Sequence, residues 1–397
     1  MKYLLTLIFY MSFTSPVWAI ETLSLDSFLK MVSEQNLSLK ANSAEVDAAK
    51  AKEVGVDIPP PMVGLTQMHD QSGSANGFEI SQSIPFPTKL SSNHLARKFD
   101  SQSKQASLEA AKTELLAKSR LLYVSLWLGE ERIKFLNERK SAIQQHLKLS
   151  NASARSDSFL RIHVLKAESD LDLLENEIIE QEQVFREKQI QMAEFSGNDP
   201  NSFKPLILAP LISEIPNLES LSQPIQLESK RFDLENLKAR ESEAKSSWLP
   251  DLNFRYREMG GTSLNPRYGE MMIGVSLPFV FFWEPNAAAT TAAAERQKGE
   301  VEFDLEKLRI DSRKASLFAK AQALKKQLDQ INNKLLPRAE KRMRLVQNIA
   351  PRDMESIQDH REAMEAFPDL KLKTLKLREQ FEETVAELTS FKSKGQP

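Results

Sequence analysis

Two stretches of the chain alternate in side-chain character with a period of two, and they constrain the fold more than any other feature. They run Gly77–Phe86 and Glu270–Phe279. A strand with one buried face has this period. Both stretches end in Ser-(Ile or Leu)-Pro-Phe, and Ser83 and Ser276 are 193 positions apart in a chain of 397 residues. The spacing indicates one structural unit used twice. The apolar faces comprise Phe78, Ile80, Ile84 and Phe86 in the first stretch, and Met271, Ile273, Val275, Leu277 and Phe279 in the second.

A partner strand precedes each of these stretches. Met62 to His69 is one candidate, and Asp70 to Gly77, rich in Ser, Gly and Asn, is expected to be its hairpin loop. Asp251 to Glu258 is the other, followed by a loop containing Gly260-Gly261 and Asn265-Pro266. We therefore expect hairpins over 62–88 and 250–280.

Long helical patterns separate the hairpins. In the first half, one helix is expected from Ser24, a candidate cap, to about Val56, and a second from Ser91 to about Leu149. A reversal over 151–158 then leads into a return helix over 159–195. Gly129 is the only breaker in the second helix, which would reach roughly 90 Å. No compact globule needs such a length, whereas a coiled coil does.

The second half repeats this order. Helices are expected over 225–247 and 286–349, with a kink at Pro337, and a last helix follows a reversal over 350–353 and runs to about Ser390. The predicted organisation is a signal peptide over 1–19, a first repeat over 20–200, a linker over 201–224, a second repeat over 225–392 and a disordered tail over 393–397. The signal peptide rests on Lys2, the apolar run from Leu4 to Met11 and the small-x-small site at Val17-Trp18-Ala19.

Composition excludes several classes of function. Lys plus Arg is 53 and Asp plus Glu is 55, so there is no basic excess for nucleic acid. The chain has no cysteine, which excludes disulfides, thiolate zinc sites, a cysteine nucleophile and a lipidated N-terminal cysteine.

Two arrangements of the four strands satisfy the alternation. Three copies could pool them into a closed twelve-stranded barrel in lipid, with the polar side chains facing a wet interior. A soluble antiparallel sheet with one solvated face gives the same pattern. In the barrel, Arg255 and Arg257 are candidates for the lumen, because an outward arginine is costly at the membrane midplane. The other residues expected on the wet face are Glu79, Ser81, Ser83, Asn253, Gly274 and Ser276.

With its paired Ser-(Ile or Leu)-Pro-Phe strand ends, each followed by a long helix, the chain resembles the TolC-type outer-membrane efflux channel family over nearly its whole mature length. Gln82-Ser83-Ile84-Pro85, followed by Pro87-Thr88-Lys89, is similar to the heavy-metal efflux branch. Leu335-Leu336-Pro337-Arg338-Ala339-Glu340 is similar to the Leu-Pro-x-Ala motif of the second long helix. Val164-Leu165-Lys166-Ala167-Glu168 resembles the helix start after the first reversal.

The resemblance implies a mainly α fold with a membrane β part. Duplicated halves would supply long antiparallel coiled-coil helices to an α-barrel, and four strands per chain to a twelve-stranded β-barrel in a homotrimer. The channel would sit in the outer membrane of a double-membrane bacterium, surrounded by its lipid, and extend into the periplasm. Its partners would be a periplasmic adaptor (membrane fusion) protein and an inner-membrane pump of the resistance-nodulation-division type, with metal cations as one candidate cargo.

The two reversals are the expected adaptor contacts. They carry Arg155, Ser156 and Asp157 in the first, and Pro351 and Arg352 in the second. Solvated turns without a partner are the alternative. The family often has a glycine in each reversal, and this sequence has none near Arg155 or Arg352.

Acidic residues after the second reversal are candidates for a periplasmic gate. Three chains would repeat Asp353, Glu355 and Asp359 as a ring that attracts cations. An ordinary helix start also favours acids.

Neither a catalytic nor a metal site is expected. The five histidines lack metal-ligand spacing, and strand packing explains Met62, Met271 and Met272 better than copper binding. The predicted function is therefore a passive exit duct without enzyme activity or cofactor. A periplasmic coiled-coil scaffold or adaptor without a pore is the alternative.

Overall fold

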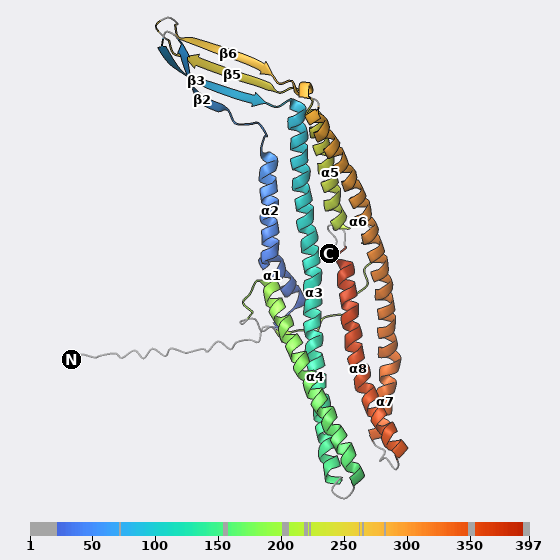
Figure 1. The fold of residues 1–397 in the computed structure, drawn as a ribbon. Coiled ribbons are helices and arrows are strands. Elements are labelled where there is room, and N and C mark those ends of the chain that lie inside the picture. Colours follow the sequence, from blue (N-terminus) through green and yellow to red (C-terminus); the bar gives the residue numbers. More distant parts are fainter. Residues whose placement is uncertain are drawn as a thin grey trace, which may run out of the picture. The chain divides into compact units, whose positions relative to one another are not determined.

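The computed structural model describes residues 22–70, 73–153, 158–200, 206–217, 221, 224–261, 263, 266–281, 283–347 and 354–391. Within them, long helices accompany a four-stranded sheet and a short two-stranded one (Figure 1). The predicted signal peptide and tail lie outside the described residues.

The chain forms two compact units. One comprises Met1–Asn36, Ser119–Ile212 and Leu336–Glu379, and the other Leu37–Lys118, Ser213–Leu335 and Gln380–Pro397. Each unit contains segments from both predicted repeats. The compact units therefore do not coincide with the repeats.

The larger sheet contains both predicted hairpins. Its strands are β2 (Met62–Asp70), β3 (Gly73–Ile84), β5 (Leu252–Met259) and β6 (Tyr268–Val275), and all neighbouring pairs are antiparallel. The order β2-β3-β5-β6 leaves β2 and β6 as edges.

Two predicted boundaries in this sheet are wrong. The expected loop 70–77 is mostly strand, because β2 and β3 stay paired as far as Asp70 and Gly73. The second alternating stretch stops short of Phe279: β6 ends at Val275, and η2 (Pro278–Phe281) is a 3-10 turn.

Helices of the second unit lead into and out of the sheet. They are α2 (Leu37–Val54), the first part of α3 (Pro87–Ser153), α5 (Ile225–Ser246) and α6 (Trp283–Gln330). Small polar side chains join α3 to α5: the Ser92 hydroxyl donates to that of Ser242 (3.1 Å), and Ser103 and Ser107 both contact Ser229. Such small side chains let the two helices lie close together.

The first unit is built from α1 (Leu25–Gln35), the rest of α3, α4 (Ser158–Ser196), α7 (Leu336–Gln347) and α8 (Met354–Thr389), which passes into the second unit near its end. Strands β1 (Thr22–Leu23) and β4 (Leu206–Ile207) pair in parallel beside them. The buried core includes Leu136, Leu174 and Ile178 from the predicted coiled-coil pattern. As predicted, α4 ends at Gly197, whose φ of 69° lets the Asn198 N–H reach the Ala193 carbonyl (2.9 Å).

One predicted helix differs in extent from the structure. The expected helix 24–56 is two helices, because α1 ends at Asn36, whose side-chain amide donates to the Phe195 carbonyl (3.0 Å). Ser24 does cap α1, accepting from the Ser27 N–H (3.2 Å). Gly129 does not break α3; a Cβ there would lie 3.3 Å from the Phe185 ring, so glycine serves packing between α3 and α4.

The kink expected at Pro337 takes the form of a π-helical turn. Residues Ile331–Leu335 (η3) widen the helix between α6 and α7, directly before the proline. Because proline has no N–H to donate, a wider turn accommodates the missing bond. None of the described helices is both long enough and apolar enough to cross a membrane.

Candidate functional site: a sheet with two unlike faces

One face of the four-stranded sheet is apolar and uncovered. Directly opposite residues lie on the same face, so the register places Val63, Ile80, Tyr256 and Met271 in one row across the four strands. Ile273 is 61% exposed, Val275 51% and Leu65 93%. No helix of its own unit covers this face, so these apolar side chains lack a partner within the described chain.

The opposite face carries charge. The next row joins Gly64, Glu79, Arg257 and Glu270. Arg257 donates through Nε (2.9 Å) and Nη2 (2.7 Å) to Glu79 Oε2, and its Nη1 lies 4.0 Å from Glu270 Oε2. Two carboxylates therefore flank Arg257, and their combined charge exceeds that of the arginine.

A second polar row lies nearer the helices. It joins Met62, Ser81, Arg255 and Met272. Arg255 Nη2 lies 3.6 Å from Met272 Sδ. A cavity of about 360 Å³ opens on this part of the face, lined in part by Ser81, Ser83, Asn253 and Arg255.

Asp251 fastens the sheet to the start of α3. Its Oδ1 accepts from the Phe86 N–H (3.0 Å) and from Lys89 Nζ (2.8 Å). Its own N–H donates to Ser276 Oγ (2.7 Å), and its carbonyl accepts from the Ser276 N–H (2.9 Å). One aspartate thus ties β3, β5, the segment after β6 and the first turn of α3 together, and its charge suits a helix N-terminus.

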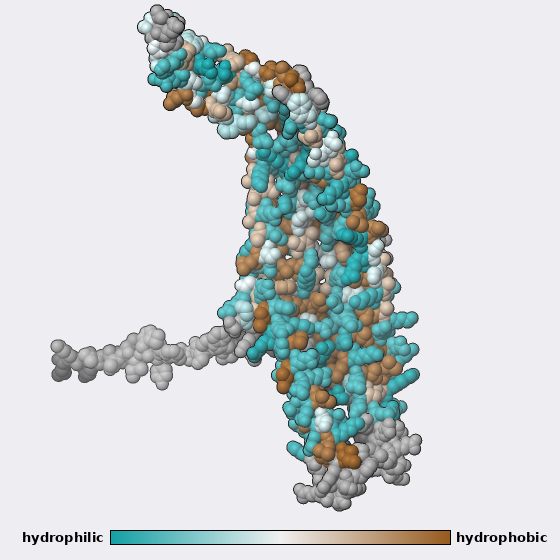
Figure 2. Space-filling view, in the orientation of Figure 1, coloured by the Kyte–Doolittle hydropathy of each residue, from teal (hydrophilic) through white to brown (hydrophobic). Residues whose placement is uncertain are grey.

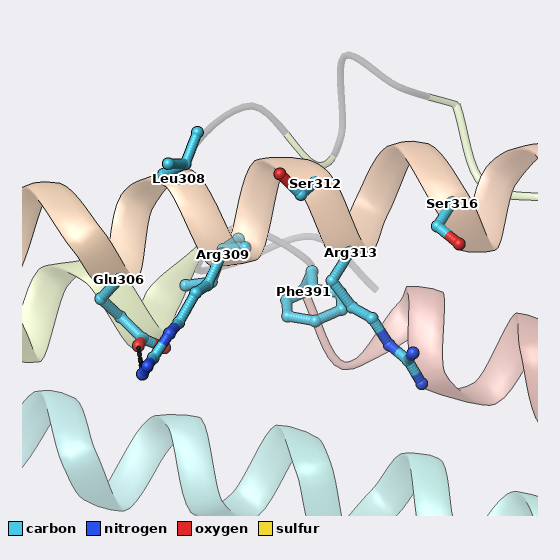
Figure 3. Close-up of a pocket in the computed structure, with 8 residues that line it drawn as sticks. Glu306, Leu308, Arg309, Ser312, Arg313, Ser316 and Phe391 are labelled. Carbon is cyan, nitrogen blue, oxygen red and sulfur yellow. Dashed lines mark ion pairs between the residues drawn. The ribbon is translucent and has the colours of Figure 1, made fainter.

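The helices carry a separate open groove of about 660 Å³ along α6. Figure 3 shows Phe391 between Arg309 and Arg313, with Glu306 paired to Arg309. Arg313 is paired with Glu387 (2.5 Å), which holds the pKa of Arg313 above its ordinary value through this hydrogen bond and the opposite charge.

Exposed apolar side chains also occur along the helices. On α4 they include Ile162, Leu165, Leu173 and Ile179, and on α6 Val301, Leu305 and Leu308. In Figure 2 the visible helical surface is mostly hydrophilic, with hydrophobic side chains in separate patches.

Solved structures share this arrangement. The MtrE outer-membrane channel of Neisseria gonorrhoeae, in its open state, matches with a TM-score of 0.78 at 14% identity, over 92% of this chain and 88% of MtrE. The Campylobacter jejuni CmeC outer-membrane channel matches with a TM-score of 0.77 at 13% identity, over 94% and 87%. CusC, a transmembrane channel, matches with 0.77 at 11%, over 93% and 92%.

The chain has the fold of the TolC-type outer-membrane channels. No protein-family model and no curated relative matches its sequence. The structural matches therefore confirm the predicted fold class. Their sequence identities are low, so they show a shared fold and nothing further. Because the identity to CusC does not exceed the others, these matches do not distinguish a branch of the TolC-type fold.

The residues predicted to form the tips lie largely outside the described residues. Arg155, Ser156, Asp157, Pro351, Arg352 and Asp353 are not among the described residues. Glu355 and Asp359 belong to the first turns of α8, and their side chains are not described. The adaptor contacts and the gate therefore stay predictions.

Two polar groups of the sheet were not predicted from the sequence. In the hairpin register Glu270 lies directly opposite Arg257, so the two side chains are on the same face of the sheet. The position of Glu270 on the polar face could therefore have been inferred. The role of Asp251 could not be predicted, because its partners Phe86 and Lys89 are more than 160 residues away in the sequence. Arg255 and Arg257 both lie on the polar face.

Proposed function

We propose that the chain is a passive exit duct of a tripartite export system in the outer membrane. Three copies close their sheets into a twelve-stranded barrel, and their long helices continue the duct into the periplasm. The proposal is supported by the likeness to outer-membrane channels such as MtrE and CmeC. The duct itself carries out no chemical reaction.

A single observation carries the proposal: the apolar face of the sheet is exposed, while its opposite face carries Arg257 paired with Glu79 and Glu270. A soluble sheet buries its apolar face against a core. In a bilayer that face meets lipid, and the unpaired edges of β2 and β6 must be closed, since an open edge costs several kcal/mol per unsatisfied group. Pairing β6 of one copy with β2 of the next removes both edges.

The partners follow from this position. The reversals around Arg155 to Asp157 and around Pro351 and Arg352 are proposed to meet a periplasmic adaptor, which links the duct to an inner-membrane pump of the resistance-nodulation-division type. Asp353, Glu355 and Asp359 are proposed to form an acidic ring at the periplasmic mouth. The segment over 1–19 is proposed to be removed on export.

Metal cations are the proposed cargo class that the resemblance favours. The test is growth of a strain lacking the gene on graded metal salts. Increased sensitivity that the intact gene restores would support this cargo, and unchanged sensitivity would count against it.

The decisive experiment is membrane fractionation followed by an unheated gel and conductance in planar bilayers. We expect extraction only with detergent, migration as a trimer and stable conductance. A soluble monomer in the periplasmic fraction, without a pore, would instead identify the chain as a coiled-coil scaffold or adaptor.

A further inference from the structure

The two arginines on the polar face of the sheet differ in how their charge is balanced. Arg257 lies between Glu79 and Glu270. Among the residues that the structure describes, no carboxylate oxygen lies within 4.0 Å of the Arg255 guanidinium. Its recorded contact is the Met272 thioether, a weak and neutral acceptor. Among these residues, Arg255 therefore has no carboxylate in direct contact.

The surroundings of Arg255 suit an oxyanion. Ser81 stands directly opposite it on β3, and Asn253 lies two residues away on the same face of β5. Both line the 360 Å³ cavity together with Ser83. Hydroxyl and amide groups supply further donors, while Glu79, the acidic residue in the lining, directs its Oε2 to Arg257. A guanidinium fork with neutral donors around it matches a carboxylate.

The row of Arg255 also lies at a different level along the strands from the row of Arg257. It lies two residues closer to the helical end of β5 than the row of Arg257, which is about 7 Å along a strand. That separation lies within the screening length of roughly 8 Å at physiological salt, so the carboxylates of the Arg257 row still act on Arg255, and the preference of this row for an oxyanion comes from its direct contacts. A solute that enters from the helices meets Arg255 before it meets the carboxylates.

We propose that Arg255, with Ser81 and Asn253, forms an oxyanion-binding row in the duct that selects carboxylate-bearing solutes. The inference rests on the proposed function, because only a closed barrel turns this face into a lumen. Three copies then present three such guanidinium groups. The row concerns carboxylate-bearing solutes, including metal ions held in carboxylate complexes, and the metal cargo proposed above keeps its own growth test.

The test is block of single-channel current by citrate, a trivalent carboxylate, using the purified full-length protein in planar bilayers. Citrate is added to each compartment in turn. We expect block of the wild-type channel, and an R255Q variant should need about tenfold more citrate for half block, the change that one lost charge-assisted hydrogen bond produces. An R255K variant should retain most of the block.

Two further variants separate charge at this site from general effects. In N253D a nearly isosteric carboxylate neutralises Arg255 without removing it, so citrate block should weaken as in R255Q even if R255Q does not assemble. R267Q removes one positive charge from the same sheet at an exposed arginine that pairs with Glu258 outside the cavity lining, so it should leave the block near its wild-type value.

The outcomes distinguish the two proposals. A wild-type protein that forms no channel overturns the exit-duct proposal. A wild-type channel whose citrate block is absent, or is unchanged in N253D and in any R255Q channel that forms, overturns the oxyanion row and leaves the duct standing.

Discussion

The carboxylate of Glu382 on α8 accepts two hydrogen bonds from Ser213, one from its backbone N–H (2.9 Å) and one from its hydroxyl. Glu382 is only 2% exposed. A buried carboxylate is tolerated because its oxygens are satisfied. This pair fixes the segment before α5 against the last helix of the chain.

We predict that E382A destabilises the protein by about 3 kcal/mol, because it leaves the Ser213 donors buried and unpaired. The measurement is the thermal unfolding midpoint of the detergent-solubilised protein, followed by circular dichroism. E383A is the matched control, since Glu383 is the exposed neighbour and its removal should change little. Equal midpoints for the two variants would contradict the prediction.

A second prediction concerns Tyr123, which is 1% exposed and donates its hydroxyl to the Leu23 carbonyl (2.6 Å). Burial raises the pKa of the Tyr123 hydroxyl. The folded state therefore keeps this proton at pH values where the unfolded chain loses it. The stabilisation is complete below the ordinary tyrosine pKa of about 10 and is lost as the pH rises through the raised value.

The Y123F variant should lose roughly 1 kcal/mol at neutral pH, the net value of one hydrogen bond. Its stability should also fall less steeply than that of the wild type under alkaline conditions. Unfolding midpoints across the alkaline range test this, with Y256F as control because Tyr256 is exposed on the sheet. Parallel pH profiles for wild type and Y123F would show that Tyr123 does not contribute.

The junction at Asp251 gives a third prediction. D251A removes the acceptor for both the Phe86 N–H and Lys89 Nζ, so we expect a loss of about 2 kcal/mol and a lower yield of heat-stable assembly on unheated gels. D251N keeps an oxygen acceptor for the Phe86 N–H but not the charge facing Lys89, so its loss should be smaller. A larger loss in D251N than in D251A would rule out this account.

Lipid contact is tested at two adjacent positions on opposite faces of β6. Ile273 is exposed on the apolar face, whereas Met272 lies beside Arg255 on the polar face. We expect I273E to impair membrane assembly, since a carboxylate facing lipid costs up to a few kcal/mol. M272E should assemble normally. Similar assembly of both variants would mean that the apolar face does not meet lipid.

The last prediction concerns the π-helical turn before Pro337. P337A restores the missing N–H, so the segment over 331–337 should adopt a regular helix with slower amide hydrogen exchange. The control is P368A, which changes the proline inside α8 and should leave exchange in this segment unaltered. Unchanged exchange in P337A would show that the turn has another cause.

Helices and strands were predicted well where apolar side chains recur at a regular spacing. The strands around Ile80 and Ile273 and the long helices rest on side-chain periods that local geometry imposes. The extension of β3 back to Gly73 could not be predicted, because it depends on backbone pairing with β2 and its residues are typical of loops. The break at Asn36 depends on a contact with Phe195, which is distant in sequence.

The candidate site was predictable only in part for the same reason. Alternation placed Arg255 and Arg257 together on a wet face. Their different charge environments depend on the register between β5 and β6, which brings Glu270 opposite Arg257 and Met272 opposite Arg255. Register is set by turn geometry and packing rather than by composition.

The unlike edges of the sheet have a genetic consequence. In the proposed barrel β2 of one copy meets β6 of the next, so the contact joins two different surfaces, and a ring closes only when every member supplies both. A subunit with a damaged β6 can still enter through its intact β2 and leave the ring open. In a cell that makes normal and damaged chains equally, about one three-membered ring in eight is wholly normal, so such alleles should be dominant.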